Sequence, residues 1–466
     1  MSVVSSPLSV VHVILSEAKN LCSCSVLELR RCFAESTLGE LQRSFSRDCG
    51  IRMTENGLRM TRTTDDGPRT ARSSPMSKPC LMMVAGERSG DIYGAGLASA
   101  LRSRLNNAEI FGCGGEAMRL AGVDTVVDAH QLTMIGITEI VGGLPRAYRA
   151  FHALLAEVDR RRPQLAVLID FPDFNLRLAK QLKKRRIRVV YFVSPQVWAW
   201  RKSRLKQLKA RIDKMLCIFD FEEAIYRAAE IPVEYVGHPL VDLVRPRLTR
   251  EQFFGELGLE PATPTVALLP GSREKEVSSI LPTMLEAAHR LSLTHKAQFV
   301  VAVAPTLDTQ WLEKAFLQPY AGRVMVRTAT QATYDALEHC DVAIVASGTA
   351  TLEAALRERP MVVVYRVSRL TWLLGGLLVR VPFYCMVNIL AGKGVVPELI
   401  QHDFTAAKVA GRVEYLLDHP QAREVMAQEL RALKDHLGPG GAVGRAADAV
   451  VGRIQDPGFG IQDEPG

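Results

Sequence analysis

The chain has 466 residues, of which 47% are hydrophobic and 23% are charged, and these proportions are ordinary for a globular protein. Its formal net charge of +8 favours anionic partners, such as nucleic acid, a membrane surface or a phosphorylated substrate. The sequence has no zinc-finger spacing, RRM signature or basic-zipper heptad, and no run of about 18 apolar residues. We therefore expect no nucleic-acid partner and no membrane-spanning helix.

Residues 1–75 lack sustained periodicity and are rich in Ser, Thr and Arg. The stretch 59–75 is polar and rich in helix and strand breakers, which is typical of a disordered segment. The first strong strand pattern comes just after Met76. We expect residues 1–75 to be a disordered tail, or an extension caused by a start codon assigned too early. A targeting extension is the alternative.

From residue 81 onward, short Val, Ile and Leu runs alternate with helical patterns, which indicates parallel sheets covered on both faces. The runs form two series, so the sequence predicts an α/β protein with two doubly wound, Rossmann-like domains. We expect an N-terminal domain at 76–245, a linker at 246–264 and a C-terminal domain at 265–466, whose last helices could pack back on the first domain. The predicted strands are 81–86, 165–170, 189–194, 215–219, 266–272, 298–305, 342–347 and 361–366.

Polar and Gly-rich residues follow several of these strands, where ligands of open α/β sheets bind. In the segment 342–356, a buried strand leads through Ser347-Gly348-Thr349 directly into a helix. Such a helix start offers backbone N–H groups and the positive end of the helix dipole to a phosphate. Glu353 lies about one turn further, where a carboxylate could reach ribose hydroxyls. The alternative is a plain strand-to-helix turn with Glu353 as an ordinary first-turn acid.

Several long motifs together resemble one known family. GERSGDIYGAGL (86–97), DFPDFN (170–175), YFVSPQVWAWR (191–201), VGHPLVD (236–242), LPGSREKEV (269–277), ASGTATLE (346–353) and MVVVYR (361–366) occur in the order and spacing of lipid A disaccharide synthase. The resemblance runs from about residue 81 to about residue 450 and does not include the N-terminal segment.

The resemblance implies a glycosyltransferase of the GT-B type, with two facing domains and a cleft between them. It implies transfer of 2,3-diacylglucosamine from UDP to 2,3-diacylglucosamine 1-phosphate. The products would be the β-1,6-linked lipid A disaccharide 1-phosphate and UDP. The family inverts the anomeric centre and needs no metal or other cofactor, so none is expected here.

Inverting transfer needs a base for the acceptor hydroxyl and a charge sink for the departing diphosphate. Asp170 is the candidate base, because it ends a predicted strand and matches the family's proposed base. The alternative is that Asp170 caps the following turn. The family often has Ala before the proline of this motif, where the present chain has Phe171. Asp173 is expected to orient the loop.

Without a metal, the protein must supply the positive charge. Arg273 is the leading diphosphate contact and a catalytic candidate, helped by backbone donors of the Gly271-Ser272 turn; the alternative is a surface arginine. His238 could contact the leaving phosphate or assist the base, or be only a turn residue. The remaining nucleotide-binding candidates are Ser347, Gly348, Thr349, Glu353, Arg366 and Asn388.

Other motif residues are candidates for the acceptor side and the walls of the cleft. These are Glu87, Ser89, Asp91, Asp173, Asn175, Ser194 and Trp198. Glu87, Ser89 and Asp91 could instead fix the first loop, and Trp198 could serve only in packing.

The acyl chains must be kept out of water, and the family is peripheral at the inner membrane of Gram-negative bacteria. Ile137, Ile140, Val141 and Leu144 have the spacing of one apolar helix face. They could lie on the membrane or face an ordinary core. A basic cluster within 180–206 could face anionic lipid or be a solvated helix face. We expect a cytoplasmic protein bound peripherally at the inner membrane, with a homodimer as a further possibility from the family.

Two alternative functions remain at this stage. A UDP-N-acetylglucosamine 2-epimerase shares the fold and would act on a soluble sugar without any membrane face. A non-catalytic protein that binds nucleotide sugars is the second. The acids at 170 and 173 and Arg273 argue against the second, because a degenerate site would have lost one of them.

Overall fold

The fold is that of a computed structural model. It describes residues 78–106, 108–129, 140–195, 197, 204–367 and 382–456, and for residues 140–145 it describes the backbone alone. The expectations for residues 1–75 therefore lie outside the described residues.

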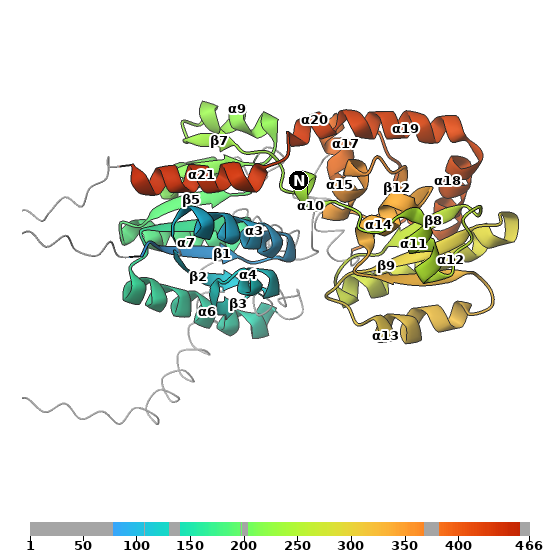
Figure 1. The fold of residues 1–466 in the computed structure, drawn as a ribbon, viewed down its shortest axis with the longest axis horizontal. Helices are drawn as coiled ribbons and strands as arrows, with labels where there is room; N and C mark the ends of the chain where they lie inside the picture. Colours follow the sequence, from blue (N-terminus) through green and yellow to red (C-terminus); the bar gives the residue numbers. More distant parts are fainter. Residues whose placement is uncertain are drawn as a thin grey trace, which may run out of the picture. The chain divides into compact units, whose positions relative to one another are not determined.

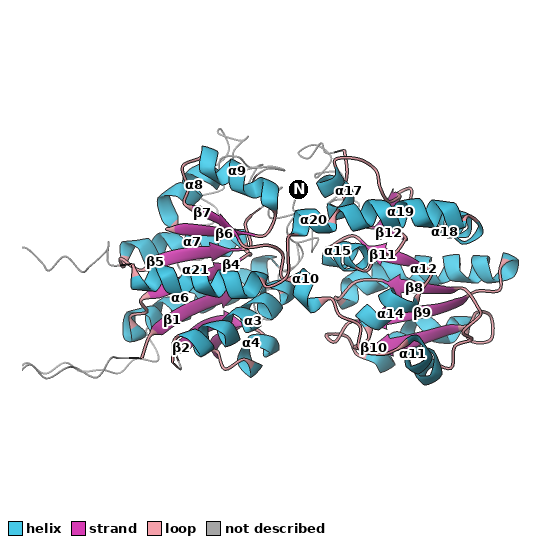
Figure 2. Cartoon of the chain, turned by 45° about the horizontal axis from the view of Figure 1, so that its top comes forward, coloured by secondary structure: helices cyan, strands magenta, loops and turns pink. Residues whose placement is uncertain are grey.

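The first sheet has seven parallel strands in the order β3-β2-β1-β4-β5-β6-β7. Successive residues of β1 point to opposite faces, as the pleat requires. Leu81 and Met83 join one apolar cluster, and Met82 and Val84 join another. Helices cover both faces (Figure 2). The strands are β1 (Cys80–Ala85), β2 (Glu109–Gly114), β3 (Asp124–Asp128), β4 (Leu165–Ile169), β5 (Arg188–Phe192), β6 (Lys214–Cys217) and β7 (Val233–Tyr235).

The second sheet repeats this plan with six parallel strands in the order β10-β9-β8-β11-β12-β13. Val266 and Leu268 of β8 pack into one cluster, while Ala267 and Leu269 face the other side. The fold class predicted from the sequence, two Rossmann-like sheets, is thus confirmed. The strands are β8 (Thr265–Leu269), β9 (Gln298–Val303), β10 (Val326–Thr330), β11 (Val342–Ala346), β12 (Met361–Tyr365) and β13 (Glu398–Ile400).

Helices connect the strands of both sheets (Figure 1). Around the first sheet they are α3 (Arg88–Arg104), α4 (Glu116–Leu120), α6 (Ile140–Arg161), α7 (Pro172–Lys184), α8 (Arg204–Arg211), α9 (Asp220–Ala228) and α10 (Leu240–Leu243). From the second sheet onward they are α11 (Arg250–Leu257), α12 (Glu274–Thr294), α13 (Thr309–Leu312), α14 (Thr333–His339), α15 (Thr349–Leu356), α17 (Met386–Ala391), α18 (Ala406–Asp418), α19 (Pro420–Ala432), α20 (Lys434–Leu437) and α21 (Ala442–Gln455). A short π-helix, Glu313–Leu317, and a 3₁₀ turn of helix, Gln318–Tyr320, follow α13.

The last helix, α21, packs on α3 of the first sheet, and both lie together in Figure 1. Arg104 Nε on α3 donates to Asp448 Oδ1 on α21 at 2.6 Å. The N–H of His238 also donates to the carbonyl of Leu437 at 2.8 Å. The chain therefore returns to its first sheet after completing the second.

Among the described helices, none is long and apolar enough to cross a membrane.

Candidate active site

Two carboxylates follow adjacent strands of the first sheet. Glu87 comes after β1 and Asp170 comes directly after β4, and these strands pair in parallel with Ala85 opposite Ile169. Burial, and next the negative charge of Glu87, raises the pKa of Asp170 to about 7. Arg204 and a hydrogen bond from the Phe171 N–H act in the opposite direction on that pKa. A carboxyl group with this pKa can take up a proton near neutral pH.

The turn that carries Asp170 has an uncommon backbone conformation. Asp170 has φ +47° and Phe171 has φ +48°, the left-handed region that costs a non-glycine residue about 1–2 kcal/mol. Pro172 follows at the first position of α7. The Phe171 ring stacks on Phe174, with centroids 5.5 Å apart. It also occupies the space beside Gly86, where an added Cβ would lie 2.3 Å from the Phe171 ring.

Asp173, three residues after Asp170, is engaged in an ion pair. Arg204 Nη2 on α8 lies 2.6 Å from Asp173 Oδ1, and the arginine side chain is only 7% exposed. A buried guanidinium needs such a partner. This contact supports the expectation that Asp173 orients the loop.

The second sheet contributes a positively charged group to the same region. Arg273 precedes the first residue of α12, and its Nη2 lies 4.0 Å from Glu87 Oε2. The preceding turn has Gly271 at φ +114°. The Ser272 N–H donates to Glu276 Oε2 at 3.2 Å. The Glu276 carboxylate thus already accepts from one backbone donor of the turn that the sequence assigned to a phosphate.

The turn after β11 leaves room beside its glycine. A Cβ added to Gly348 would meet no atom of the described residues within 4 Å. Ser347 is buried, and its backbone N–H continues the ladder to Val364 O at 2.9 Å. Thr349 begins α15. Among the described residues, the space beside Gly348 is therefore open, which is compatible with close approach of a phosphate to this helix start.

Glu353 lies on α15 in a half-buried position. Burial raises the pKa of Glu353 to about 7, against the opposing effects of the Arg88 charge and a hydrogen bond with Tyr334. Arg88 belongs to α3 of the first sheet and Tyr334 to α14 of the second. Residues of both sheets thus surround this carboxyl group.

His238 is buried as a neutral ring. Its Nδ1 accepts from the Leu240 N–H at 3.1 Å, so a neutral ring carries its proton on Nε2. Tyr93 and Phe219 flank the ring, with centroids 6.0 and 5.4 Å away. Burial lowers the pKa of His238 to about 3, so the group can donate a hydrogen bond near pH 7 but carries no positive charge.

Other predicted site residues have structural partners. The Asp91 carboxylate accepts from the backbone N–H groups of Gly115, Ala117 and Met118 at 2.7–3.1 Å and so caps α4. The Ser194 hydroxyl donates to buried Glu222. These bonds join α3 to the start of α4, and a contact of Asp91 with the acceptor stays a prediction.

Arg366 and Asn388 are held within the second half of the chain. Arg366 Nη2 donates to Phe404 O at 2.7 Å, and its guanidinium lies over the Phe404 ring. The Asn388 side chain bonds to Val396 O at 2.9 Å and is buried. Of the remaining candidates, Ser89 lies in the first turn of α3.

The proposed membrane face is not described in side-chain detail. Ile140, Val141 and Leu144 lie in the first turns of α6, where the backbone alone is described. Ile137 and Trp198 lie outside the described residues.

Much of the basic cluster has partners within the protein. Lys183 pairs with Asp213 at 2.7 Å and Arg185 with Asp159 at 2.6 Å. Arg188 donates to the carbonyl oxygen of Asp456, after α21, at 3.0 Å. These contacts favour an intramolecular role for this part of the cluster.

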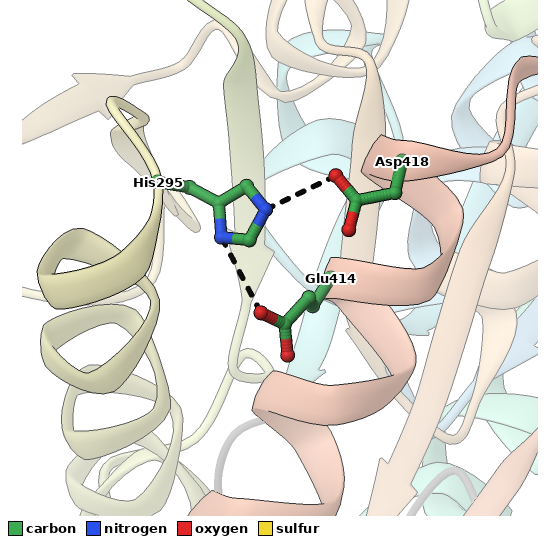
Figure 3. Close-up of side chains that lie close together, drawn as sticks. All are labelled: His295, Glu414 and Asp418. Atoms are coloured by element: carbon green, nitrogen blue, oxygen red, sulfur yellow. Dashed lines mark hydrogen bonds and ion pairs between the residues drawn. The ribbon is translucent and has the colours of Figure 1, made fainter.

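One group among the described residues has the composition of a metal site. His295, at the end of α12, faces Glu414 and Asp418 of α18 (Figure 3). Nε2 of His295 lies 3.1 Å from Asp418 Oδ1, but Nδ1 is the atom nearest Glu414 Oε1, at 3.6 Å. The two carboxylates are thus nearest to different nitrogens of the imidazole ring. The contact ties two helices together.

Sequence reasoning missed several residues that surround the candidate site. Glu276 lies three residues after Arg273, at a first-turn position where an acid commonly accepts from backbone N–H groups, so its spacing offered a signal. Arg88 and Tyr334 approach Glu353 from different sheets, and no local pattern marks that approach.

Comparisons with known proteins agree with this arrangement. The sequence model of the Lipid-A-disaccharide synthetase family matches residues 81–439. A lipid-A-disaccharide synthase of Koribacter versatilis is 45% identical over 381 residues, which cover 80% of this chain and 98% of the relative. The corresponding protein of Solibacter usitatus is 43% identical over 80% of this chain and 97% of its own length.

Solved structures share the fold at low sequence identity. UDP-GlcNAc 2-epimerase from Neisseria meningitidis has a TM-score of 0.56 at 13% identity, covering 80% of this chain and 99% of its own. The calicheamicin glycosyltransferase CalG4 has a TM-score of 0.52 at 16% identity, covering 82% and 100%. These likenesses establish the GT-B arrangement of two Rossmann-like sheets, and the sequence comparisons establish more: the chain belongs to the lipid-A-disaccharide synthase family of glycosyltransferases.

Proposed function

We propose that this chain transfers 2,3-diacylglucosamine from UDP to 2,3-diacylglucosamine 1-phosphate. The products are the β-1,6-linked disaccharide 1-phosphate and UDP. Family membership supports this over the epimerase alternative, since the epimerases resemble the chain in fold alone. The observation that carries the proposed mechanism concerns Asp170. This residue directly follows the carboxyl end of β4, and its pKa is raised to about 7.

In this proposal, Asp170 accepts the proton of the acceptor's 6-hydroxyl as that oxygen attacks the anomeric carbon from the face opposite UDP. The bond from the anomeric carbon to the diphosphate oxygen breaks, and UDP leaves with the electron pair. A single displacement of this kind inverts the anomeric centre. The base needs a pKa close to the working pH to be deprotonated and still basic.

The second sheet supplies the leaving-group contacts in the same scheme. Arg273 offers a bidentate guanidinium to the diphosphate, and the turn at Gly348 offers backbone N–H groups in open space. Glu353 is proposed to contact the ribose hydroxyls. His238, being neutral, can contribute a hydrogen bond from Nε2 rather than a charge. We propose that no metal ion takes part.

The test is transfer between the two purified lipid substrates, with the disaccharide detected by mass spectrometry and UDP by a coupled assay. Asp170→Asn should abolish transfer while UDP still binds. Wild-type turnover by this variant would refute the base assignment. Activity should survive EDTA. Consumption of water-soluble UDP-N-acetylglucosamine alone would instead favour an epimerase.

We also propose that the protein binds peripherally to the inner membrane, because both substrates carry acyl chains that must leave water. The support is the apolar spacing of Ile137, Ile140, Val141 and Leu144 in the sequence. Co-sedimentation with anionic vesicles should fall when Ile140 and Val141 are changed together to Ser. Light scattering after gel filtration would test the proposed homodimer.

A further inference from the structure

The turn that carries Asp170 is held in place by two side chains. Asp170 and Phe171 are consecutive non-glycine residues with positive φ, and Phe171 also precedes Pro172. A residue before proline normally adopts an extended conformation. Both residues of the turn therefore have backbone conformations that their residue types usually avoid. Contacts with the surrounding structure must maintain these conformations.

Those contacts converge on one atom, the carbonyl oxygen of Asp170. Asn175 Nδ2 donates to it at 2.7 Å, and the Tyr191 hydroxyl donates to it at 2.6 Å. The Asp170 N–H donates to Phe192 O at 3.0 Å. The backbone of Asp170 is thus fixed on both sides, and both lone pairs of its carbonyl oxygen are used.

Both donors are committed to this turn. Tyr191 and Asn175 are fully buried. Asn175 Nδ2 also donates to Ile169 O at 3.2 Å, while its Oδ1 has no hydrogen-bond partner among the described residues. A buried oxygen without a partner is unfavourable, so this oxygen does not favour the observed orientation of the amide. The two bonds donated by Nδ2 therefore hold the amide in place. Burial, and next the nearby Asp170 charge, raises the pKa of Tyr191 well above its usual value, so its hydroxyl keeps its proton.

The carboxyl group that this turn presents lies in a specific electrostatic setting. The pKa of this carboxyl group is raised because the group is sheltered from water and lies near Glu87. The raised pKa therefore depends on the group keeping this position. If the Asp170 carbonyl rotated, the Asp170 side chain would turn with it. The exposure of its carboxyl group to water would then change. The titratable and charged groups around Asp170 are Glu87 and Tyr93 from the first loop and α3, Asp173 from α7, Tyr191 from β5 and Arg204 from α8.

We infer that Tyr191 and Asn175 are positioning residues for the transfer reaction: by holding the Asp170 carbonyl oxygen, they keep the Asp170 carboxyl group in the orientation in which it accepts the acceptor's proton. This inference rests on the proposed function, because it gives these residues a role only if Asp170 is the base.

The test is Tyr191→Phe, which removes one oxygen atom and keeps the ring. We expect kcat to fall about 10- to 100-fold, with KM and UDP affinity changed less than about twofold. A less confined Asp170 meets more water, so its pKa falls. Because the base works deprotonated, the acid limb of the kcat profile should move to lower pH by about one unit.

Tyr226→Phe is a matched control. Tyr226 is also fully buried in the first half of the chain, and its hydroxyl also donates to a backbone carbonyl, that of Pro195, at 3.1 Å. The control removes the same kind of hydrogen bond from a carbonyl oxygen other than that of Asp170. We expect its loss of Tm to be comparable, its kcat to stay within about threefold of wild type and its acid limb to stay in place.

Asn175→Ala removes the other donor and should act in the same direction as Tyr191→Phe, which covers the case in which Tyr191→Phe does not fold. The positioning role is refuted if Tyr191→Phe matches Tyr226→Phe in kcat and acid limb. It is also refuted if neither Tyr191→Phe nor Asn175→Ala folds while Tyr226→Phe does, because the bonds are then structural. If Asp170→Asn keeps wild-type turnover, Asp170 is not the base and the proposed mechanism is refuted. That result can be distinguished from the two outcomes that refute only the positioning role.

Discussion

Arg273 Nη2 lies 4.0 Å from Glu87 Oε2, so a cation beside the second sheet faces an anion beside the first. Glu87 in turn acts on Asp170, since its charge raises the pKa of that carboxyl group. The cation proposed for the diphosphate and the proposed base are therefore linked through one glutamate.

Glu87→Gln should move the acid limb of the kcat/KM profile to lower pH. Removing the negative charge of Glu87 makes ionised Asp170 less unfavourable, so the pKa of Asp170 falls from about 7 by about half a unit to one unit. Glu116→Gln, which removes an exposed charge on α4, is the control and should leave the limb in place. An unmoved limb in Glu87→Gln would show that Glu87 does not act on the base.

Compared with the wild type, Asp170→Asn and Glu353→Gln should each stabilise the fold more at pH 8 than at pH 5. Both groups have a folded pKa of about 7, above the ordinary carboxyl value, so the folded state binds protons more tightly than the unfolded state. In the wild type, stability due to these groups is therefore present near pH 4 and is lost as pH rises to about 7. The gain at pH 8 should be about 1–4 kcal/mol.

Urea unfolding at the two pH values measures this gain. Glu256→Gln, at an exposed position on α11, is the control and should change stability equally at both. Equal effects of Asp170→Asn at pH 5 and pH 8 would contradict the predicted proton linkage.

Asp173→Asn should destabilise the fold by about 1–3 kcal/mol, because it removes the charge 2.6 Å from the buried Arg204 guanidinium. The carboxylate itself is 36% exposed, which reduces the cost below that of a fully buried pair. Glu223→Gln breaks the i,i+4 pair with Arg227 at 2.9 Å, in which the arginine side chain is 70% exposed, and should cost no more than about 0.5 kcal/mol. Equal losses of stability for Asp173→Asn and Glu223→Gln in denaturant unfolding would mean that the burial of Arg204 adds nothing to the contribution of its ion pair.

His295→Ala should lower stability by only about 0–1 kcal/mol and leave transfer unchanged, since the side chains of its partners Glu414 and Asp418 are 41% and 51% exposed to water. If these contacts serve only to join α12 and α18, Zn²⁺ should shift the Tm of wild type and variant by the same amount. A shift in the wild type alone would identify a metal site there.

The sequence patterns located the interior of each sheet better than its edges. All eight predicted strands are present, as β1, β4, β5, β6, β8, β9, β11 and β12. Four of the missed strands, β3, β7, β10 and β13, are the outermost strands of their sheets. Edge strands bury fewer residues, so their apolar pattern is weak. The fifth, β2, lies inside the sheet, but Gly112 and Gly114 interrupt its apolar run.

The candidate site was predictable where one motif contains both the residue and its strand end. Asp170 and the Gly348 turn are of this kind. Contacts between distant segments could not be read from local spacing, and these include Glu87 with Arg273, Arg88 with Glu353 and Tyr191 with the Asp170 carbonyl. The left-handed turn at Asp170 was equally hidden, because neither of its residues is glycine.

The Phe171 ring occupies the place where a side chain at Gly86 would lie, and this makes the two positions interdependent in evolution. Alanine at position 86 is incompatible with the phenylalanine but would be accommodated once position 171 carries a small residue. The change at position 171 must therefore precede alanine at position 86, so this contact sets the order in which the two substitutions can arise.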